Sequence, residues 1–332
     1  SGELTVFADP GRIPGGFDQH VGPGVRVLPE SEAEKVLSGF SGRRVLADPD
    51  TANAWTQLAL EAGGATLLAG DDPVLIPKAC KNEVEIEGAR QAHVRDAVAE
   101  IKFLAWLDAE VAAGRLHDEA HLADRLAGFR EQSEHYRGPS FDTISAAGGN
   151  AAMCHYNHLN AAAPGALTPN SVYLVDSGGQ YPDGTTDITR TIAIGEPNDE
   201  VRRMFTLVLK GHIALDQARF PKGTTGTQLD VLARQFLWRE GFDYDHGTGH
   251  GVGAFLSVHE GPQRVAKAHN PFALRAGMIL SNEPGYYRDS AYGTRCENLV
   301  VVREARSAGE VPMLEFEALT LVPFDQRLLD TS

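Results

Sequence analysis

The hydrophobic and polar positions at the start of the chain predict a small α/β domain. Short apolar runs alternate there with polar loops, and three of the runs are expected to be strands: Leu4–Ala8, Arg44–Ala47 and Ala65–Ala69. A helical pattern over Thr51–Ala62 would connect the last two strands in a βαβ-like arrangement. We therefore expect a thin domain over residues 1–76 that leaves a sheet edge open.

A larger domain is expected over residues 77–325. Pro77 interrupts the patterns on both sides of it, which makes it the expected boundary. Strand candidates and amphipathic helices follow it, and they predict helices packed on one side of a mostly antiparallel sheet, an α+β fold. The later elements expected here are helices near residues 118–131 and 198–218, a helix capped by Thr227 and Asp230, and short strands at Phe141–Ser145 and Met153–Tyr156.

The first long helix of this domain has a recognisable start. Asn82 is followed by Glu85 three residues later, which is the spacing of a capping box. His93 has polar neighbours, and we expect it to be solvated. The apolar positions that share one face of this helix are Val94, Val98, Ile101 and Ala105.

A predicted hairpin brings two carboxylates together. Val172–Asp176 is a strand candidate, Pro182–Gly184 is a turn, and Thr185–Ile194 is the expected returning strand. This hairpin delivers Asp176 and Asp187 from apolar surroundings toward one polar spot. Two buried like charges cannot both remain ionised without a countercharge, so either one carboxyl holds a proton or a cation lies between them.

A second pair of carboxylates follows farther along the chain. Glu283 ends a strand candidate that begins at Met278, and Glu297 begins one that continues to Val302. A glycine-rich segment between the hairpins supplies His250, and glycine lets the backbone approach a ligand closely. Four carboxylates and one imidazole suit a pair of hard divalent ions such as Mn²⁺ better than structural zinc. Two such ions, about 3.5–4 Å apart, would bridge and activate a water.

Structural explanations compete with this interpretation. A buried salt bridge to Arg190 or Arg295 would also account for the strand carboxylates. Asp183 is sufficiently explained by its Pro-Asp-Gly turn, and His212 lies in an apolar stripe and is expected to be a core histidine. Cys296 points away from its neighbours in the strand, so we expect it to pack. His158 is likewise expected to be structural.

Composition narrows the class of protein. The chain has 332 residues, 45 of them acidic and 30 basic, with a formal net charge of −15. No basic stripe is visible, which argues against nucleic acid or an anionic membrane as a partner. Cys80, Cys154 and Cys296 lack zinc or disulfide spacing, which favours a reducing compartment such as the cytoplasm. We expect neither a transmembrane span nor a signal peptide.

The motifs around these residues resemble those of the pita-bread metallopeptidases, specifically aminopeptidase P (Xaa-Pro aminopeptidase) of the cytosolic, eukaryote-like type. The resemblance runs from about Ile76 to about Leu321, with a weaker match before it. The matching motifs are Val175–Tyr181, Asp183–Thr191, His246–Gly253, Val258–Pro262, Glu283–Tyr287 and Arg295–Glu297.

This resemblance implies a fold and an activity. The fold would be a pita-bread catalytic domain preceded by a creatinase-type N-terminal domain, of which residues 1–76 would be a part. The activity would be hydrolysis, with two metal ions, that releases the N-terminal residue from peptides with proline in second position. The family commonly forms homodimers, so we expect a homodimer as well.

The resemblance also assigns metal ligands. Asp176 and Asp187 would hold one ion. Asp187, His250, Glu283 and Glu297 would hold the other, with Asp187 and Glu297 bridging. Glu283 would in addition carry a proton to the leaving amine.

The remaining site residues are implied in the same way. His155, which taken alone would more often be a core histidine, is expected with His259 near the scissile carbonyl, where both would stabilise the oxyanion. His246 would line the pocket for the proline ring, unless it only braces the glycine-rich segment. Tyr287 and Arg295 would support the ligands.

Three related functions remain open. In prolidase the third histidine typically follows the metal-ligand histidine by seven residues, whereas His259 follows His250 by nine. A metal-free, creatinase-like hydrolase would lack the ligands that this chain keeps. A non-catalytic pita-bread binding module would also be expected to have lost them.

Overall fold

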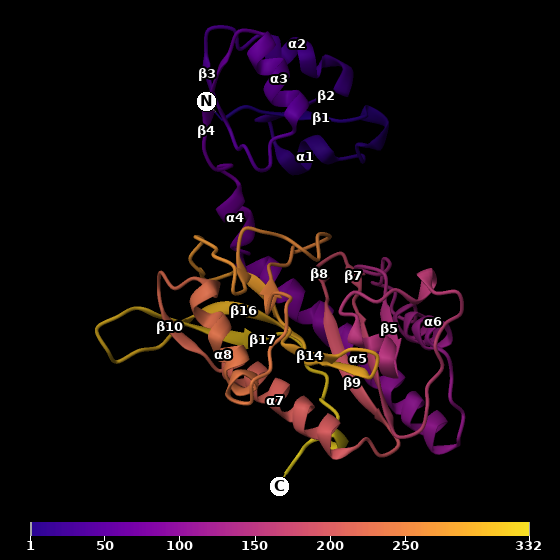
Figure 1. Ribbon diagram of the computed structural model, residues 1–332. Coiled ribbons are helices and arrows are strands. Elements are labelled where there is room, and N and C mark those ends of the chain that lie inside the picture. The colour runs from indigo at the N-terminus through magenta and orange to yellow at the C-terminus, as the bar shows by residue number, and fades with distance from the viewer. Residues whose placement is uncertain (1, 332) are drawn as a thin grey trace. The chain divides into compact units, whose positions relative to one another are not determined.

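The chain forms two compact units, Ser1–Leu75 and Ile76–Ser332, in a computed structural model that describes residues 2–331 (Figure 1). In the first unit β1 (Leu4–Phe7) pairs in parallel with β2 (Val25–Leu28). A second parallel pair, β3 (Arg44–Ala47) and β4 (Thr66–Ala69), is connected by α3 (Ala54–Ala62), so the predicted βαβ-like arrangement is confirmed. The unit also contains α1 (Phe17–Val21), α2 (Ala33–Ser38), η1 (Pro10–Arg12) and η2 (Glu30–Glu32).

The prediction of three strands in this unit was wrong. β2 was missed because its four residues, Val-Arg-Val-Leu, are too few to establish a period. Within the described part of the unit, Ala33 and Leu60 are the only apolar residues that are buried. The unit is therefore as thin as the sequence indicates.

The second unit begins with helices that pack on an antiparallel sheet. The predicted capping box is confirmed: Asn82 Oδ1 accepts from the Glu85 amide at 3.0 Å, and Glu85 Oε2 accepts from the Asn82 amide at 2.8 Å. The elements of this layer are α5 (Glu83–Ala112), α6 (Glu119–Arg130) and the sheet β5–β6–β9, formed by Ile144–Ala147, Ser171–Ser177 and Ile188–Ile194.

The buried face of α5 differs from the one that its apolar residues suggested. Val94 and Val98 are 45% and 50% exposed, whereas His93, expected in solvent, is buried. The buried face carries Asp96 and Glu100, which form ion pairs with Arg130 of α6 at 2.8 and 2.6 Å. Charged residues that are neutralised in this way hide a buried face from a hydrophobicity pattern.

A second antiparallel sheet forms the other half of the unit, where the sequence predicted one sheet. Its strands are β10 (Arg219–Pro221), β17 (Met313–Ala318), β16 (Asn298–Ala305) and β13 (Ile279–Asn282), in that order. The helices α7 (Asp199–Asp216) and α8 (Gly226–Arg239) lie side by side (Figure 1).

The second sheet and the helices α7 and α8 pack around one hydrophobic core. Leu215 of α7 and Ala233 of α8 pack there with Leu280 of β13 and Val300 of β16. Helices on antiparallel sheets confirm the α+β class. The cap of α8 is Thr225 with Gln228, two residues before the predicted Thr227.

None of the helices described between residues 2 and 331 combines the length and apolarity that a membrane crossing requires.

Short elements around the sheets complete the unit. Met153–Tyr156, expected to be a strand, is a turn between two 3-10 helices. The remaining elements are α4 (Leu75–Ala79), β7 (Gln180–Tyr181), β8 (Gly184–Thr185), β11 (Gly249–His250), β12 (Arg264–Val265), β14 (Gly285–Arg288), β15 (Tyr292–Arg295), η3 (Gly148–Ala152), η4 (His158–Asn160) and η5 (Gln326–Leu328).

Candidate active site

A cavity of about 600 Å³ in the second unit brings the predicted site residues together. All of them except Tyr287 line this cavity, and the hydroxyl of Tyr287 contacts two that do. The predicted residues that line it are His155, Asp176, Asp187, His246, His250, His259, Glu283, Arg295 and Glu297.

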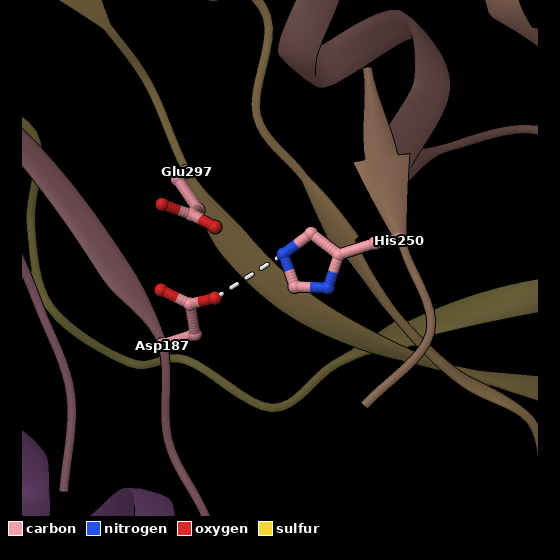
Figure 2. Close-up of side chains that lie close together, drawn as sticks. All are labelled: Asp187, His250 and Glu297. Atoms are coloured by element: carbon pink, nitrogen blue, oxygen red, sulfur yellow. Dashed lines mark ion pairs between the residues drawn. The ribbon is translucent and has the colours of Figure 1, made fainter. Parts of the chain in front are cut away.

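Three of these side chains converge on one point (Figure 2). Asp187, His250 and Glu297 each offer a ligand atom, and these atoms lie within 4.8 Å of one another. His250 Nε2 is 3.4 Å from Asp187 Oδ2, the ion pair that Figure 2 marks. Asp187 lies in a break between β8 and β9, not inside one continuous strand as predicted. Glu297 occupies the corresponding gap between β15 and β16.

The backbone around His250 explains why its segment is rich in glycine. A Cβ at Gly249 would lie 1.9 Å from the main-chain oxygen of Ser281, so only glycine permits this approach to β13. The His250 amide donates to Ser281 Oγ at 2.9 Å. The glycine that we expected to serve a ligand therefore brings the histidine-bearing strand against β13.

Glu283 directly follows β13, and its side chain lies beside that of His250. Its Oε1 is 3.4 Å from His250 Nε2 and accepts from Ser281 Oγ at 3.0 Å. The Glu283 amide donates to the carbonyl of Thr248 at 2.8 Å, which fixes the backbone. His250 therefore lies between two carboxylates, those of Asp187 and Glu283.

Asp176 shows both of the arrangements considered for a buried strand carboxylate. Its Oδ2 accepts from Arg295 Nη2 at 2.6 Å, which is the salt bridge that competes with metal binding. Its Oδ1 is buried and has no hydrogen-bond partner. Arg190 contacts neither aspartate and instead donates to main-chain oxygens and to Asn298. One oxygen of Asp176 thus remains to ligate a cation.

The pKa values of the site carboxyls are shifted because several of them are buried together. Burial raises the pKa of Asp187 to about 7, and the charge of Asp176 adds to the rise. Burial also raises the pKa of Glu283 and of Glu297. Burial alone would lower the pKa of His250, but the hydrogen bond to Asp187 and the charge of Glu283 raise it to about 9. An oxygen-rich group of carboxylates in this state fits divalent cations.

A chain of hydrogen bonds fixes the tautomer of His246. Arg295 Nη1 donates to the hydroxyl of Tyr287 at 2.7 Å, and this oxygen lies 2.8 Å from His246 Nε2. His246 Nδ1 is 2.7 Å from the carbonyl of Gly247, which requires the proton on Nδ1. Burial and the Arg295 charge lower the pKa of His246 to about 3, so the ring is neutral.

The other two histidines lie on the open part of the cavity. The ring centroid of His259 is 4.2 Å from that of His250. Burial, followed by the His250 charge, lowers the pKa of His259. His155 is exposed and lines the same cavity.

Two supporting residues were missed from the sequence. Thr189 Oγ1 donates to Glu297 Oε2 at 2.5 Å and accepts from Arg295 Nε at 3.1 Å. Arg234, which is fully buried, donates to the carbonyl of His246 at 2.8 Å. The sequence placed Thr189 on the same face of the predicted returning strand as Asp187, which was a usable signal for Thr189. Nothing in the sequence pattern indicated Arg234.

The residues predicted to be structural lie outside this cavity lining. His212 is buried, and its Nδ1 is 3.0 Å from the carbonyl of Asn282. Cys296 and His158 are also buried. Their burial agrees with the expected packing roles.

Comparisons with known proteins place the chain among the metallopeptidases. It is 43% identical over 350 residues to a probable Xaa-Pro aminopeptidase P of Tuber melanosporum, which covers 98% of the chain and 56% of the relative. A relative of the same name from Arthroderma gypseum is 46% identical over 313 residues, covering 92% of the chain and 48% of that relative. The chain thus spans about half the length of the curated relatives it matches.

Solved structures agree with these relatives. An X-prolyl aminopeptidase from Caenorhabditis elegans, described as a cytosolic enzyme with a di-nuclear active site, superposes with a TM-score of 0.91 at 37% identity, covering 99% of this chain and 55% of that one. A prolidase from Pyrococcus furiosus has a TM-score of 0.73 at 22% identity, covering 97% of this chain and 88% of that one, and shows the shared fold.

Family models cover both units. Residues 1–85 match the creatinase/prolidase N-terminal domain, and residues 87–304 match metallopeptidase family M24. The pita-bread α+β fold is thereby confirmed. The chain belongs to metallopeptidase family M24.

Proposed function

We propose that this chain provides the catalytic part of a metal-dependent Xaa-Pro aminopeptidase. It would release the N-terminal residue from peptides with proline in second position. The observation that carries the proposal is the convergence of Asp187, His250 and Glu297 in a cavity that also holds Asp176 and Glu283. The similarity to aminopeptidases P over nearly the whole chain supports the same substrate class.

The proposed ligands are those implied by the sequence. The unpartnered Oδ1 of Asp176 and the carboxylate of Asp187 would hold one ion, and Asp187, His250, Glu283 and Glu297 would hold the other. Bound there, two divalent cations would polarise the scissile carbonyl and lower the pKa of the attacking water. Because every donor is oxygen or imidazole nitrogen, we propose Mn²⁺ as the metal.

Glu283 is the proposed proton carrier of the reaction. Ser281 Oγ and the carbonyl of Thr248 fix its side chain and its backbone, respectively. Held in this way at the edge of the cavity, its carboxylate takes the proton of the attacking water and returns it to the leaving nitrogen.

The histidines have different proposed roles because their surroundings differ. Both ring nitrogens of His246 are engaged, so its ring offers a flat, partly apolar wall for the proline. His259 is kept neutral by its lowered pKa and therefore has one N–H to donate to the oxyanion, with His155 on the same open side. A neutral wall suits a substrate whose scissile bond lacks an N–H.

The wider assignments rest on the same relationship. We propose that residues 1–76 are part of a creatinase-type N-terminal domain and that residues 77–325 form the catalytic domain. We also propose that the protein forms a homodimer. We propose that it works in the cytosol, because the similar nematode enzyme is described as cytosolic.

Cleavage assays separate the alternatives. We expect the purified chain, supplied with Mn²⁺, to cleave Arg-Pro-Pro but to leave Arg-Ala-Ala largely intact. Cleavage of Xaa-Pro dipeptides in preference to tripeptides would instead indicate a prolidase. A chain that binds Mn²⁺ and cleaves none of these peptides would be a binding module. Equal cleavage of Arg-Pro-Pro and Arg-Ala-Ala would contradict the proposed substrate class.

A further inference from the structure

The segment that carries His155 has little regular structure of its own. It leaves β5 at Ala147, passes through η3 and the turn that contains His155, and continues through η4. Neither a helix nor a strand therefore fixes the position of this ring. A side chain that is to act on a substrate atom must nevertheless be held accurately, because a displacement of about 1 Å can cost about a hundredfold in rate.

One buried carboxylate holds this segment at four points. Glu119, the first residue of α6, is 0% exposed. Its Oε1 accepts from the Ala147 amide at 2.7 Å and from Asn150 Nδ2 at 2.8 Å. Its Oε2 accepts from the Tyr156 hydroxyl at 2.8 Å and from the Gly165 amide at 2.7 Å. The four donors precede and follow His155 along the chain.

The approach of the segment to Glu119 is close. A Cβ at Gly165 would lie 2.7 Å from Asn150 Nδ2 and 3.0 Å from Glu119 Oε1. On its other side, the segment packs against the β14–β15 hairpin, where a Cβ at Gly293 would lie 1.8 Å from the main-chain oxygen of Ala151. The segment is thus confined between a carboxylate and the hairpin that carries Tyr287.

We propose, on the basis of the proposed function, that Glu119 is a positioning residue that acts through His155. Its carboxylate joins both ends of the segment, and its bond to Tyr156 reaches the residue next to His155. Four bonds satisfy both oxygens of one buried carboxylate, and they hold the turn in place because another arrangement would leave that buried charge without its donors. His155 is thereby kept at the cavity while remaining exposed to substrate.

Glu119→Gln is the direct test. The amide keeps one acceptor oxygen, but its NH₂ group would face the Gly165 N–H, which cannot accept a hydrogen bond. Tyr156→Phe removes one of the four bonds to Glu119, together with the bond that the Tyr156 hydroxyl accepts from Asn150 Nδ2 at 3.1 Å. It is the milder variant if Glu119→Gln fails to fold. Glu110→Gln is the matched control, since Glu110 bonds Arg115 and His117 and does not contact the segment.

The kinetic readout is a double-mutant cycle with His155→Ala. We expect Glu119→Gln to lower kcat by about ten- to hundredfold with a smaller change in KM, and to have little further effect when His155 is already alanine. Tyr156→Phe should show the same pattern at a smaller size, and Glu110→Gln should resemble the wild type. An equal loss in the presence and absence of His155 would overturn the proposal.

A second readout does not depend on activity. Hydrogen exchange of Glu119→Gln, followed by mass spectrometry, should show faster exchange in residues 147–165 and unchanged exchange around His250. Unchanged exchange in residues 147–165 would overturn the proposal even if the variant lost activity. If the wild-type chain cleaves no Xaa-Pro peptide, the proposed function fails, and hydrogen exchange still decides whether Glu119 fixes the segment.

Discussion

The buried imidazole of His212 makes the stability of the second unit depend on pH. Burial, together with the nearby Arg190 charge, lowers the pKa of this ring from 6.5 to about 3. In the unfolded chain the ring regains its ordinary pKa, so the unfolded state binds more protons at acid pH. The stabilisation is therefore complete above about pH 6.5 and is lost progressively as the pH falls toward 3.

The expected size follows from the two pKa values. At about pH 5 the unfolded ring is almost fully protonated and the folded ring is still neutral. The difference of about 1.5 pH units from the ordinary value corresponds to about 2 kcal/mol in the free energy of unfolding. No discount for solvent screening is needed, because His212 is only 2% exposed.

Urea unfolding of the wild type and of His212→Asn at about pH 8 and about pH 5 measures this effect. Asparagine can still donate to the carbonyl of Asn282 but does not titrate. The variant should be less stable at both pH values, because the smaller side chain leaves a cavity, yet it should lose about 2 kcal/mol less between them. His269→Asn, at an exposed position, is the matched control. An identical pH dependence in the wild type and in His212→Asn would refute the reasoning.

Three further predictions concern the cavity. Chelation should lower the melting temperature, and Mn²⁺ should restore it. At a hundredfold excess over Kd, each bound ion should raise the free energy of unfolding by about 2.7 kcal/mol. Metal analysis of Asp187→Asn should show that both ions are lost. His246→Ala should weaken turnover of proline peptides with metal content unchanged, whereas His259→Ala should lower kcat more than KM. Loss of metal from His246→Ala would indicate that His246 only braces the glycine-rich segment. Thr189→Val should reduce metal affinity about tenfold in a titration, because Glu297 loses a buried donor; unchanged affinity would contradict that support.

The sequence predicted the proposed metal ligands, which the fold brings into one cavity, better than the groups that hold them. Asp176 and Asp187 were recognised because a carboxylate among apolar strand residues is costly without a partner. Glu119 was not recognised, because an acidic residue at a helix N-terminus is ordinary and its four partners lie 28 to 46 positions away along the chain. Only the folded chain brings such donors together.

Charge compensation also explains where the fold prediction failed. The buried face of α5 contains Asp96 and Glu100, whose partner Arg130 is on α6. A hydrophobicity pattern assigns such positions to solvent, so it selected the face of Val94, which is largely exposed. In contrast, the capping box at Asn82 depends on residues three positions apart, and it was predicted correctly.

The two explanations considered for Asp176 do not exclude each other. A salt bridge and a metal site were treated as alternatives, since either would neutralise a buried carboxylate. The two oxygens of Asp176 separate the roles: Arg295 binds Oδ2, and Oδ1 is buried without a partner. Arg295 also reaches Tyr287 and, through it, His246. One guanidinium therefore orients a proposed metal ligand and a proposed wall of the proline pocket, so that replacing it should disturb metal binding and proline selectivity together.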